Sequence, residues 1–533
     1  MKSTKYIFVT GGVASSLGKG IISSSIGKLL QARGYNITIQ KFDPYINVDS
    51  GTLNPNEHGE SYVTIDGHQG DLDLGHYERF TGIEVTRTNN ITTGRIYQNV
   101  IERERRGEYL GKTIQVVPHI TNEIKHQLKF LSNKGDYDFI ITEIGGTVGD
   151  IEGLPFLEAI RQYRREIGMN NAVNVHLTYV PYLSAAGELK TKPTQHSVKE
   201  LQRQGIQPDI LVLRTEHPLE QGLCNKVASF CNVDADCVVQ SIDLPTIYEV
   251  PVKMQEQGLD KAILRKLGME IGETPTLGPW KDFLNRRSKA TEVVNIALVG
   301  KYTLQDAYKS ILEALQQAGT YNDRKVKTHF ILSDKLTDEN IAESLKGMDG
   351  VIIGPGNGPR GHEGKIVAAK YCRENDIPTF GICLGMQMMV IEFARNVLGL
   401  KNANTTEYDT NAADKVIDLM DELKSRIGVE GALRKGGFEC QLDKDSRAFE
   451  AYRKENVVGR HFHRYELNNE YKKALEEKGL KCTGINQESG LVEIVEVPAC
   501  KWYVGIEFHA EYGSTVLKPN PLFVKFIEAA IKK

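Results

Sequence analysis

The sequence predicts an α/β protein made of two doubly wound parallel-sheet domains. The chain has 533 residues, which is too long for a single hydrophobic core. In both halves, short apolar runs alternate with helix-like stretches, as they do in parallel sheets that helices cover on both faces. Each half also contains a strand that leads through a glycine-rich turn into a helix, a place where α/β proteins bind ligands.

The elements can be placed in chain order. In the first half we expect strands at 6–10, 37–42, 138–146, 172–180 and 209–215. In the second half we expect strands at 294–300, 328–333, 350–356, 378–383 and 502–511.

The boundary between the two domains is predicted in one polar stretch. The run GETPTLGPWKDFLNRRSKATE at 272–292 carries prolines and charges, and a new apolar strand begins directly after it. We therefore expect one domain at 1–271, a linker at 272–292 and a second domain at 293–533.

Composition narrows the class of protein. Hydrophobic residues make up 40%, charged residues 25%, and the formal net charge is −3, values that give no reason to expect a nucleic-acid or membrane partner. We see neither a signal-peptide pattern nor about 18 consecutive apolar residues. The eight cysteines are scattered without zinc-like spacing, which is typical of reduced thiols in a cytoplasmic protein.

The run YIFVTGGVASSLGKG predicts a phosphate-binding loop. A strand, a glycine-rich loop and a helix aim backbone N–H groups at phosphate oxygens, and Lys19 would reach the terminal phosphates. The run departs from the usual P-loop, because five residues separate Gly12 from Gly18 and Gly20 replaces the Ser or Thr that contacts Mg²⁺. A tight strand–helix junction without a ligand is the alternative.

Two other segments offer the carboxylates that such a loop would need for Mg²⁺. GDLDLGHYERF places Asp71 and Asp73 between glycines, and Glu143 ends the apolar strand DFIIT. A third segment, GELKTKPTQHSVKEL, groups Lys190, Lys192 and Gln195 before a helix, which suits a second triphosphate. Solvated surface charge is the alternative for each group.

The second half contains a candidate nucleophile. In PTFGICLGMQ, Gly381, Cys383 and Gly385 have the spacing of a nucleophile elbow, and the helix N-terminus there favours a thiolate. In EFHAE, His509 and Glu511 supply a base and its orienting carboxylate. A buried structural cysteine is the alternative.

Backbone N–H groups would complete this second site. The oxyanion donors are expected from Gly356 and Asn357 in GPGNGPRG and from Leu384 beside the nucleophile. Together these groups predict amide hydrolysis through a thioester.

Through these motifs, the chain resembles the CTP synthase family along nearly its whole length. The matching runs are GGVASSLGKG, KFDPYINVDSGTLNPNEHGE, DLDLGHYERF, ERERRGEYLGKTIQVVPHIT, EIGGTVGDIEG, KTKPTQHSVKEL, GICLGMQ and ARNVLGLKNANTTE. KTKPTQHSVKEL with DLDLGHYERF is highly specific, whereas GICLGMQ alone indicates only a class I glutamine amidotransferase.

The resemblance implies a P-loop amidoligase domain followed by a class I glutamine amidotransferase domain. ATP, with Mg²⁺, would phosphorylate the 4-oxygen of UTP; glutamine would be hydrolysed at Cys383; and the ammonia would pass through a tunnel and displace the phosphate. The resemblance also implies activation by GTP, feedback inhibition by CTP and a homotetramer.

The family's functional residues carry over by motif. Catalysis falls to Cys383, His509 and Glu511 and metal binding to Asp73 and Glu143. The residues implied for ATP are Ser16, Leu17, Gly18, Lys19, Gly20, Ile21, Asp73, Ile242, Asp243 and Leu244. Those implied for UTP or CTP are Ser15, Asp150, Ile151, Glu152, Lys190, Thr191, Lys192, Pro193, Thr194, Gln195 and Lys226. Those implied for glutamine are Gly356, Leu384, Gly385, Met386, Gln387, Glu407 and Phe462.

The glutaminase half departs from the family pattern at several positions. Pro355 and Asn357 replace Gly and Phe of a PGGFG-like run, Phe462 replaces Arg, and Ala510 replaces Pro. The run EGALRKGG, around Gly431 to Gly437, replaces GGTMRLG. Because proline has no N–H, any donor needed at Pro355 is missing. These changes bear on glutamine affinity and domain coupling more than on the chemistry.

Two other interpretations fit part of the sequence. A cobyrinate-type P-loop amidase would share GICLGMQ but has no reason to carry KTKPTQHSVKEL. A non-catalytic, nucleotide-dependent filament protein would not need the intact Cys383, His509 and Glu511.

Overall fold

The chain folds into two compact units. The structure, a computed structural model, describes residues 4–51, 53–419 and 433–532. Unit 1 comprises the described residues before position 52 and Asp73–Leu284, and unit 2 comprises Leu53–Leu72 and the described residues from Asn285 onward. The change of unit after Leu284 falls inside helix α11 (Gly278–Lys289), within the stretch expected to be a linker.

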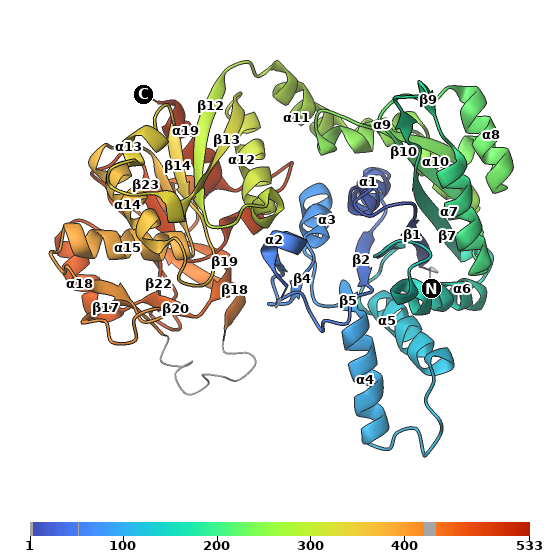
Figure 1. Ribbon diagram of the computed structural model, residues 1–533, viewed down its shortest axis with the longest axis horizontal. Coiled ribbons are helices and arrows are strands. Elements are labelled where there is room, and N and C mark those ends of the chain that lie inside the picture. The colour runs from blue at the N-terminus through green and yellow to red at the C-terminus, as the bar shows by residue number, and fades with distance from the viewer. Residues whose placement is uncertain (1–3, 52, 420–432, 533) are drawn as a thin grey trace. The chain divides into compact units, whose positions relative to one another are not determined.

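Unit 1 is built on one sheet in which all strand pairs are parallel (Figure 1). Its strands, in spatial order, are β11 (Val238–Ile242), β10 (Ile210–Thr215), β7 (Ala172–Tyr179), β1 (Lys5–Gly11), β6 (Phe139–Ile144), β2 (Ile37–Asp43) and β5 (Asn90–Thr92). The central strands are buried along their length, as the near-continuous apolar runs require. The doubly wound parallel sheet predicted for this half is confirmed.

Helices pack on both faces of this sheet. The helices of unit 1 are α1 (Lys19–Ala32), α3 (Asp73–Thr81), α4 (Thr93–Arg105), α5 (Thr121–Lys134), α6 (Leu154–Ile167), α7 (Lys192–Arg203), α8 (Gln221–Cys231), α9 (Val250–Glu256) and α10 (Leu259–Lys266). One hydrophobic cluster joins β1, β2 and β6 to α4, α5, α6 and α7. Helix α1 packs against α3 and α9. The first turn of α1 is therefore held rigidly at the end of β1.

Unit 2 has a parallel sheet with an antiparallel extension. The spatial order is β13 (Lys325–Leu332), β12 (Val293–Gly300), β14 (Gly350–Ile353), β15 (Thr379–Ile382), β23 (Tyr503–Ile506), β22 (Val492–Glu496), β21 (Lys481–Ile485), β18 (Arg434–Leu442) and β19 (Asn456–His463). Pairing is parallel from β13 to β23 and antiparallel from β23 to β19. The parallel part was predicted, and the four-stranded extension was not.

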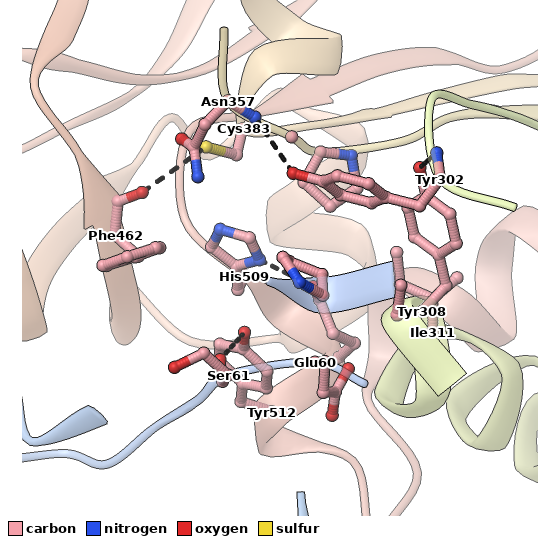
Figure 2. A pocket seen from close by; sticks show the side chains of 15 residues that line it. Glu60, Ser61, Tyr302, Tyr308, Ile311, Asn357, Cys383, Phe462, His509 and Tyr512 are labelled. Carbon is pink, nitrogen blue, oxygen red and sulfur yellow. Dashed lines mark hydrogen bonds and ion pairs between the residues drawn. The ribbon is translucent and has the colours of Figure 1, made fainter. Parts of the chain in front are cut away.

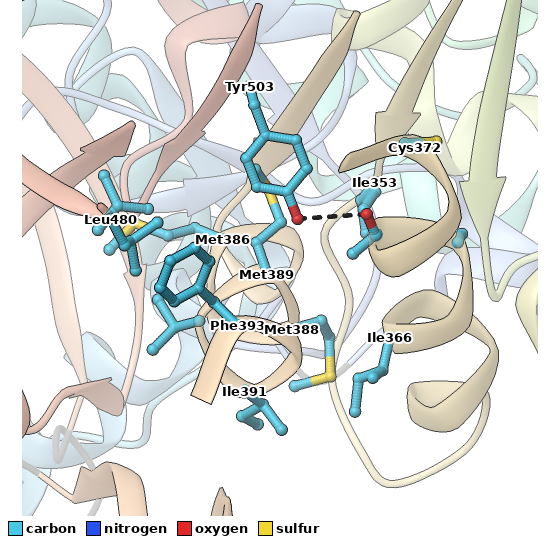
Figure 3. Packing of buried hydrophobic residues seen from close by; sticks show 14 of the residues in the cluster. Ile353, Ile366, Cys372, Met386, Met388, Met389, Ile391, Phe393, Leu480 and Tyr503 are labelled. Atoms are coloured by element: carbon cyan, nitrogen blue, oxygen red, sulfur yellow. Dashed lines mark hydrogen bonds between the residues drawn. The ribbon is translucent and has the colours of Figure 1, made fainter. Parts of the chain in front are cut away.

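Helices cover both faces of the parallel part of this sheet as well. The helices of unit 2 after its first segment are α12 (Lys309–Tyr321), α13 (Ile341–Ser344), α14 (His362–Glu374), α15 (Leu384–Asn396), α17 (Arg447–Tyr452), α18 (Asn469–Glu477) and α19 (Pro521–Ile531). Helices α14 and α15 share one core cluster, in which Met386, Met389 and Phe393 lie among aliphatic neighbours (Figure 3). Helices α12 and α19 belong to the cluster on the other face.

The segment Leu53–Leu72 belongs to unit 2 although it lies within the first half of the sequence. It contains the short helix α2 (Pro55–His58) and the hairpin of β3 (Tyr62–Val63) and β4 (Gln69–Gly70). The Glu60 carboxylate accepts a hydrogen bond from the Ser310 N–H at 2.9 Å, and Arg460 donates to the Tyr62 hydroxyl at 3.0 Å. The expected domain limits of 1–271 and 293–533 do not account for this segment, which lies within 1–271 but belongs to unit 2.

None of the helices in the described ranges is both long and apolar enough to cross a membrane.

Candidate active sites

The first candidate site lies at the carboxyl edge of the sheet in unit 1. Because all of its strands are parallel, their carboxyl ends share this edge. Strand β1 ends at Gly11 and leads into the glycine-rich loop, β6 ends beside Glu143, and β2 ends at Asp43. Chain segments more than a hundred residues apart therefore meet at one place.

The glycine-rich loop turns into α1 through backbone conformations that favour glycine. Gly18, the residue before the helix, has φ of 94°, in the left-handed region. Lys19 opens the helix, and its Nζ donates to the Gly146 carbonyl at 2.9 Å. Burial lowers the pKa of Lys19, and the Glu143 carboxylate opposes this shift. The first turn of α1 thus presents free N–H groups and a cation to the same space, as a phosphate site requires.

Gly20 and Asp73 explain the departure from the usual P-loop. A Cβ at position 20 would lie 2.1 Å from the Asp73 Oδ1 atom, so only glycine leaves room for this carboxylate. In an ordinary P-loop, a Ser or Thr side chain at this position contacts Mg²⁺. Here an aspartate from α3 fills the space that such a side chain would take.

Asp73 and Glu143 both contact one lysine, which the sequence reasoning missed. Lys41 Nζ lies 3.3 Å from Glu143 Oε1 and 3.8 Å from Asp43 Oδ1, and it also pairs with Asp73 Oδ2. The structure therefore brings Asp73 and Glu143, which are 70 positions apart, to a common cation. Their oxygens are hard ligands of the kind that Mg²⁺ prefers. The only signal for Lys41 was its place at the end of an apolar strand, in the run KFDP.

Glu143 is the most deeply buried group of this site. Burial raises its pKa to about 7, and the charge of Lys41 opposes that rise. The hydroxyl of Tyr77 on α3 donates to Glu143 Oε2. Burial thus favours the neutral form of this carboxyl group, and the charge of Lys41 favours the ionised form.

A buried histidine supports the loop from behind. His176 on β7 bonds to Thr10 Oγ1 at 2.9 Å and to Ser197 Oγ at 2.8 Å. Burial, aided by the charge of Lys19, lowers the pKa of His176 to about 3. His176 is therefore a neutral link between β1 and α7, and no motif in the sequence pointed to it.

The residues implied for UTP lie around the N-terminus of α7. Lys190 is half-buried and pairs with Glu188, whereas Lys192 is exposed. Thr194 and Gln195 are buried, and the Thr194 hydroxyl is 3.1 Å from the Thr178 hydroxyl. The two lysines are thus available to a ligand, while the buried side chains fix the turn that carries them.

The other residues implied for nucleotides are placed as follows. Asp150 accepts a hydrogen bond from the Thr147 N–H at 3.1 Å and precedes a short 3-10 helix that contains Ile151 and Glu152. Lys226 is exposed on α8, which packs against α7. Asp243 follows the end of β11 and pairs with Arg214.

The second candidate site is the turn between β15 and α15 in unit 2. Cys383 has φ of 52° and ψ of −112°, a conformation that non-glycine residues rarely adopt, and it caps α15. A Cβ at position 385 would lie 1.9 Å from the Ile353 carbonyl oxygen, and one at position 381 would lie 2.2 Å from Met389 Sδ. Both glycines of the predicted elbow are therefore required by close packing.

His509 and Glu511 stand beside this cysteine as a bonded pair. His509 Nδ1 is 2.7 Å from Glu511 Oε1, and both side chains are buried. They lie just beyond β23, which ends at Ile506, and not on the longer strand expected at 502–511. Burial would lower the pKa of His509, but Glu511 and Cys383 outweigh it and raise the pKa to about 10. The neighbouring groups thus favour the imidazolium form of His509.

These residues line one pocket of unit 2 (Figure 2). Gly356, Phe462 and Tyr512 form its walls with Cys383 and His509. Segment 53–72 contributes to the same pocket through the residues Pro55, Glu60 and Ser61. The Tyr512 hydroxyl donates to the Ser61 carbonyl at 3.3 Å. The sequence gives no pattern that connects this segment to the cysteine, because its run GTLNPNEHGE has no apolar periodicity.

The predicted oxyanion donors are only partly free. The Asn357 N–H donates to the Tyr302 hydroxyl at 3.4 Å, and the Gly354 N–H donates to the Val299 carbonyl at 3.0 Å. Pro355 has no N–H. Within the described residues, the Gly356 N–H has no hydrogen-bond partner. Gly356, with Leu384 at the start of α15, therefore provides the donors that this pocket can offer.

The side chains of the residues implied for glutamine differ in orientation. Met386 points into the core cluster, and Gln387 Nε2 donates to Glu507 Oε1 at 2.7 Å and to the Tyr465 carbonyl at 3.0 Å. Glu407 accepts a hydrogen bond from the Tyr408 hydroxyl. Phe462 faces the pocket, and its carbonyl is 3.9 Å from Cys383 Sγ.

Of the departures from the family pattern, Ala510 is buried in the turn after His509. The first part of EGALRKGG lies outside the described residues.

Both halves of the chain match known protein families. A family model for the CTP synthase N-terminus matches residues 5–269, and one for class I glutamine amidotransferases matches residues 303–529. A CTP synthase of Bacteroides thetaiotaomicron is 69% identical over 100% of this chain and 99% of its own length. A CTP synthase of Porphyromonas gingivalis is 63% identical over the same shares of the two chains.

Among solved structures, the glutaminase domain of Trypanosoma brucei CTPS with bound acivicin is 34% identical. The match covers 45% of this chain and 94% of that one, with a TM-score of 0.43.

Proposed function

The chain belongs to the CTP synthase family and carries out glutamine-dependent amination of UTP to CTP, and from this premise we propose which residues carry each step. The observation that supports the assignment most strongly is the pairing of two sites in one chain. Unit 1 holds a glycine-rich loop with carboxylates at its mouth, and unit 2 holds a cysteine on an elbow with a histidine–glutamate pair.

In unit 1, the chemistry is phosphoryl transfer followed by substitution. The 4-oxygen of UTP takes the γ-phosphoryl group of ATP, and ADP leaves. Ammonia then adds to C4, the C4–O bond breaks, and phosphate leaves. We assign the phosphates of ATP to Lys19 and the loop Ser16–Ile21, and its adenine to Ile242, Asp243 and Leu244. The backbone N–H groups at the start of α1 hold the phosphates in place, and Lys19 adds a positive charge.

Asp73 and Glu143 are the residues that would hold Mg²⁺. They fit the ion because both carboxylates reach the same cation, Lys41, and because Gly20 leaves room for Asp73. Bound there, Mg²⁺ would neutralise the charge that develops on the transferred phosphoryl group. Lys41, which contacts both carboxylates, orients them toward the glycine-rich loop.

In unit 2, the chemistry is amide hydrolysis. The Cys383 thiolate attacks the side-chain amide carbon of glutamine, and the electron pair of the C=O bond moves to the oxygen, where Gly356 and Leu384 donate hydrogen bonds. His509 gives its proton to the departing ammonia, which leaves a thioester. Water, activated by His509, then releases glutamate. Glu511 holds the imidazole and stabilises its charged form.

The triphosphate of UTP, and of the inhibitor CTP, is assigned to the segment before α7. Lys190 and Lys192 are available at the helix N-terminus, where the dipole also favours an anion. The proposed site is completed by the other residues implied for UTP or CTP, which include Ser15, Asp150, Glu152 and Lys226.

We propose that the enzyme works as a homotetramer that GTP activates. Unit 1 leaves several large apolar side chains exposed on α4, α5 and the loop between them, with Leu110 88% exposed. The others are Ile101, Val116, Val117 and Phe130. Exposed apolar side chains on these two helices and the segment between them favour a contact with another subunit. GTP activation is supported by the family resemblance.

A cytoplasmic location is proposed on the state of the cysteines. All eight are free and buried, and no disulfide joins them in the structure. Reduced thiols are typical of the cytoplasm.

One assay tests the function as a whole. The protein is incubated with ATP, Mg²⁺, UTP and glutamine, with GTP present, and CTP is measured. CTP should form, and it should not form when either ATP or UTP is left out. Ammonia should replace glutamine. Failure to form CTP with either nitrogen source would contradict the proposal.

A further inference from the structure

A fully buried lysine lies beneath the pocket of unit 2. Lys365 on α14 is 0% exposed, and within the described residues it forms no ion pair with a carboxylate. Its Nζ donates to the Gly354 carbonyl at 2.5 Å and to the Pro355 carbonyl at 3.4 Å. Burying an ammonium group without a counter-ion is costly, so a role in holding these carbonyls is the natural explanation.

The position of the Pro355 carbonyl decides the direction of the next N–H. In a trans peptide, the C=O and the N–H of one plane point in opposite directions. Among the described residues, the only cis peptide is Val117–Pro118, so the Pro355–Gly356 peptide is trans. With the Pro355 oxygen turned to Lys365, the Gly356 N–H points to the other side of the loop. Gly356 and Cys383 line the same pocket.

A second lysine holds the following peptide. Lys301, just after β12, donates from Nζ to the Asn357 carbonyl at 2.6 Å and also to the Gly358 carbonyl. Gly356 itself has φ of 153°, and a Cβ there would lie 2.5 Å from Lys301 Cδ. The loop is thus fixed on both sides of the Gly356 N–H by side chains that act on carbonyl groups.

We propose that Lys365 is a positioning residue of the glutaminase reaction. By holding the carbonyls of Gly354 and Pro355, it directs the Gly356 N–H at the oxygen that becomes negative when Cys383 attacks glutamine. The inference rests on the proposed assignment of Cys383 as the nucleophile. It also explains how the loop retains an oxyanion donor although Pro355 has none of its own.

The charges around Lys365 agree with this geometry. Burial, aided by the charge of Lys301, lowers the pKa of Lys365 to about 7, and Cys383 opposes that shift.

The test is Lys365→Met, which keeps the length and removes the donor. The matched control is Lys370→Met on the same helix, where the lysine pairs with Asp338 at 3.3 Å. For glutamine hydrolysis, Lys365→Met should lower kcat about tenfold or more and leave KM within about twofold, because the donor acts on the transition state. Lys370→Met should match the wild type. Lys365→Arg, which keeps donors and charge, should retain more of kcat than Lys365→Met.

A second measurement distinguishes a misdirected Gly356 N–H from a loss of reactivity at Cys383. Alkylation of Cys383 by iodoacetamide forms no oxyanion, so its rate in Lys365→Met should fall much less than kcat does. Thermal unfolding checks that the variant is folded. An unchanged kcat, or an alkylation rate that falls as much as kcat, would overturn the inference.

The outcome can be told apart from failure of the proposed function. If wild-type protein does not hydrolyse glutamine, or if Cys383→Ala still does, the assignment of the site fails. If both behave as proposed and Lys365→Met hydrolyses glutamine at the full rate, the role of Lys365 alone is wrong.

Discussion

Gly20 leaves the space that the carboxylate of Asp73 occupies, since a Cβ at position 20 would lie 2.1 Å from Asp73 Oδ1. One residue lies in the first turn of α1 and the other begins α3. The absence of a side chain at Gly20 and the presence of the Asp73 carboxylate therefore depend on each other.

Gly20→Ala should displace Asp73 and slow CTP formation about a hundredfold with either glutamine or ammonia, the scale of losing one group that stabilises a developing charge. Glutamine hydrolysis should persist. The matched control is Gly222→Ala on α8, where no atom lies within 4 Å of the new Cβ. Initial rates with ammonia decide the matter, and equal rates in the two variants would contradict this account.

Asp73→Asn and Glu143→Gln should each stop CTP formation with both nitrogen sources. Each change removes a negative charge from the proposed Mg²⁺ site, a loss of about 3–4 kcal/mol of transition-state stabilisation. Rates are measured across a Mg²⁺ titration, with Asp234→Asn, an exposed acid paired with Lys266, as the control. A near-normal ammonia rate in either variant would remove that residue from the site.

Cys383→Ala should abolish CTP formation from glutamine and leave formation from ammonia largely intact. The thiol acts only in unit 2, whereas phosphorylation and amination take place in unit 1. Cys500→Ala serves as the control, because this cysteine is also buried but does not line the pocket. If ammonia fails to restore CTP formation by a folded Cys383→Ala protein, the proposed division of work is wrong.

Lys190→Ala should raise the UTP concentration needed for half-maximal rate tenfold or more, because charge-assisted bonds to phosphate contribute about 1.5–3 kcal/mol each. It should also weaken inhibition by CTP, which carries the same triphosphate. The measurement is a UTP titration at saturating ATP and ammonia, with Lys199→Ala, exposed on α7, as the control. An unchanged midpoint would assign Lys190 to the solvated surface.

His509 should make stability depend on pH in the alkaline range. Its pKa in the folded protein is raised from 6.5 to about 10, so the folded state favours the imidazolium. This stabilisation is fully present below about pH 6.5 and is lost as pH rises through about 10. The difference in guanidinium midpoint between wild type and His509→Gln should therefore shrink from pH 6 to pH 10. The same comparison with His196→Gln, an exposed histidine, should show no such trend. A difference that grows with pH would contradict the imidazolium form.

The sequence was sufficient for those features that depend on neighbours along the chain. The alternation of strands and helices, the loop before α1 and the elbow at Cys383 were predicted, and the structure contains all of them. Each is set by backbone geometry over a few residues, such as the left-handed conformation at Gly18 or the close packing at Gly385. The roles assigned to individual nucleotide-binding residues stay predictions.

Only the tertiary structure decided which distant residues meet. It placed Lys41 between Asp73 and Glu143, Lys365 beside the Pro355 carbonyl, and segment 53–72 in unit 2, where it lines the pocket. It also extended the second sheet with antiparallel strands. No local pattern encodes such contacts, because they follow from the packing of whole elements against one another. The sequence by itself determined the two chemical motifs, and the fold decided what surrounds and orients them.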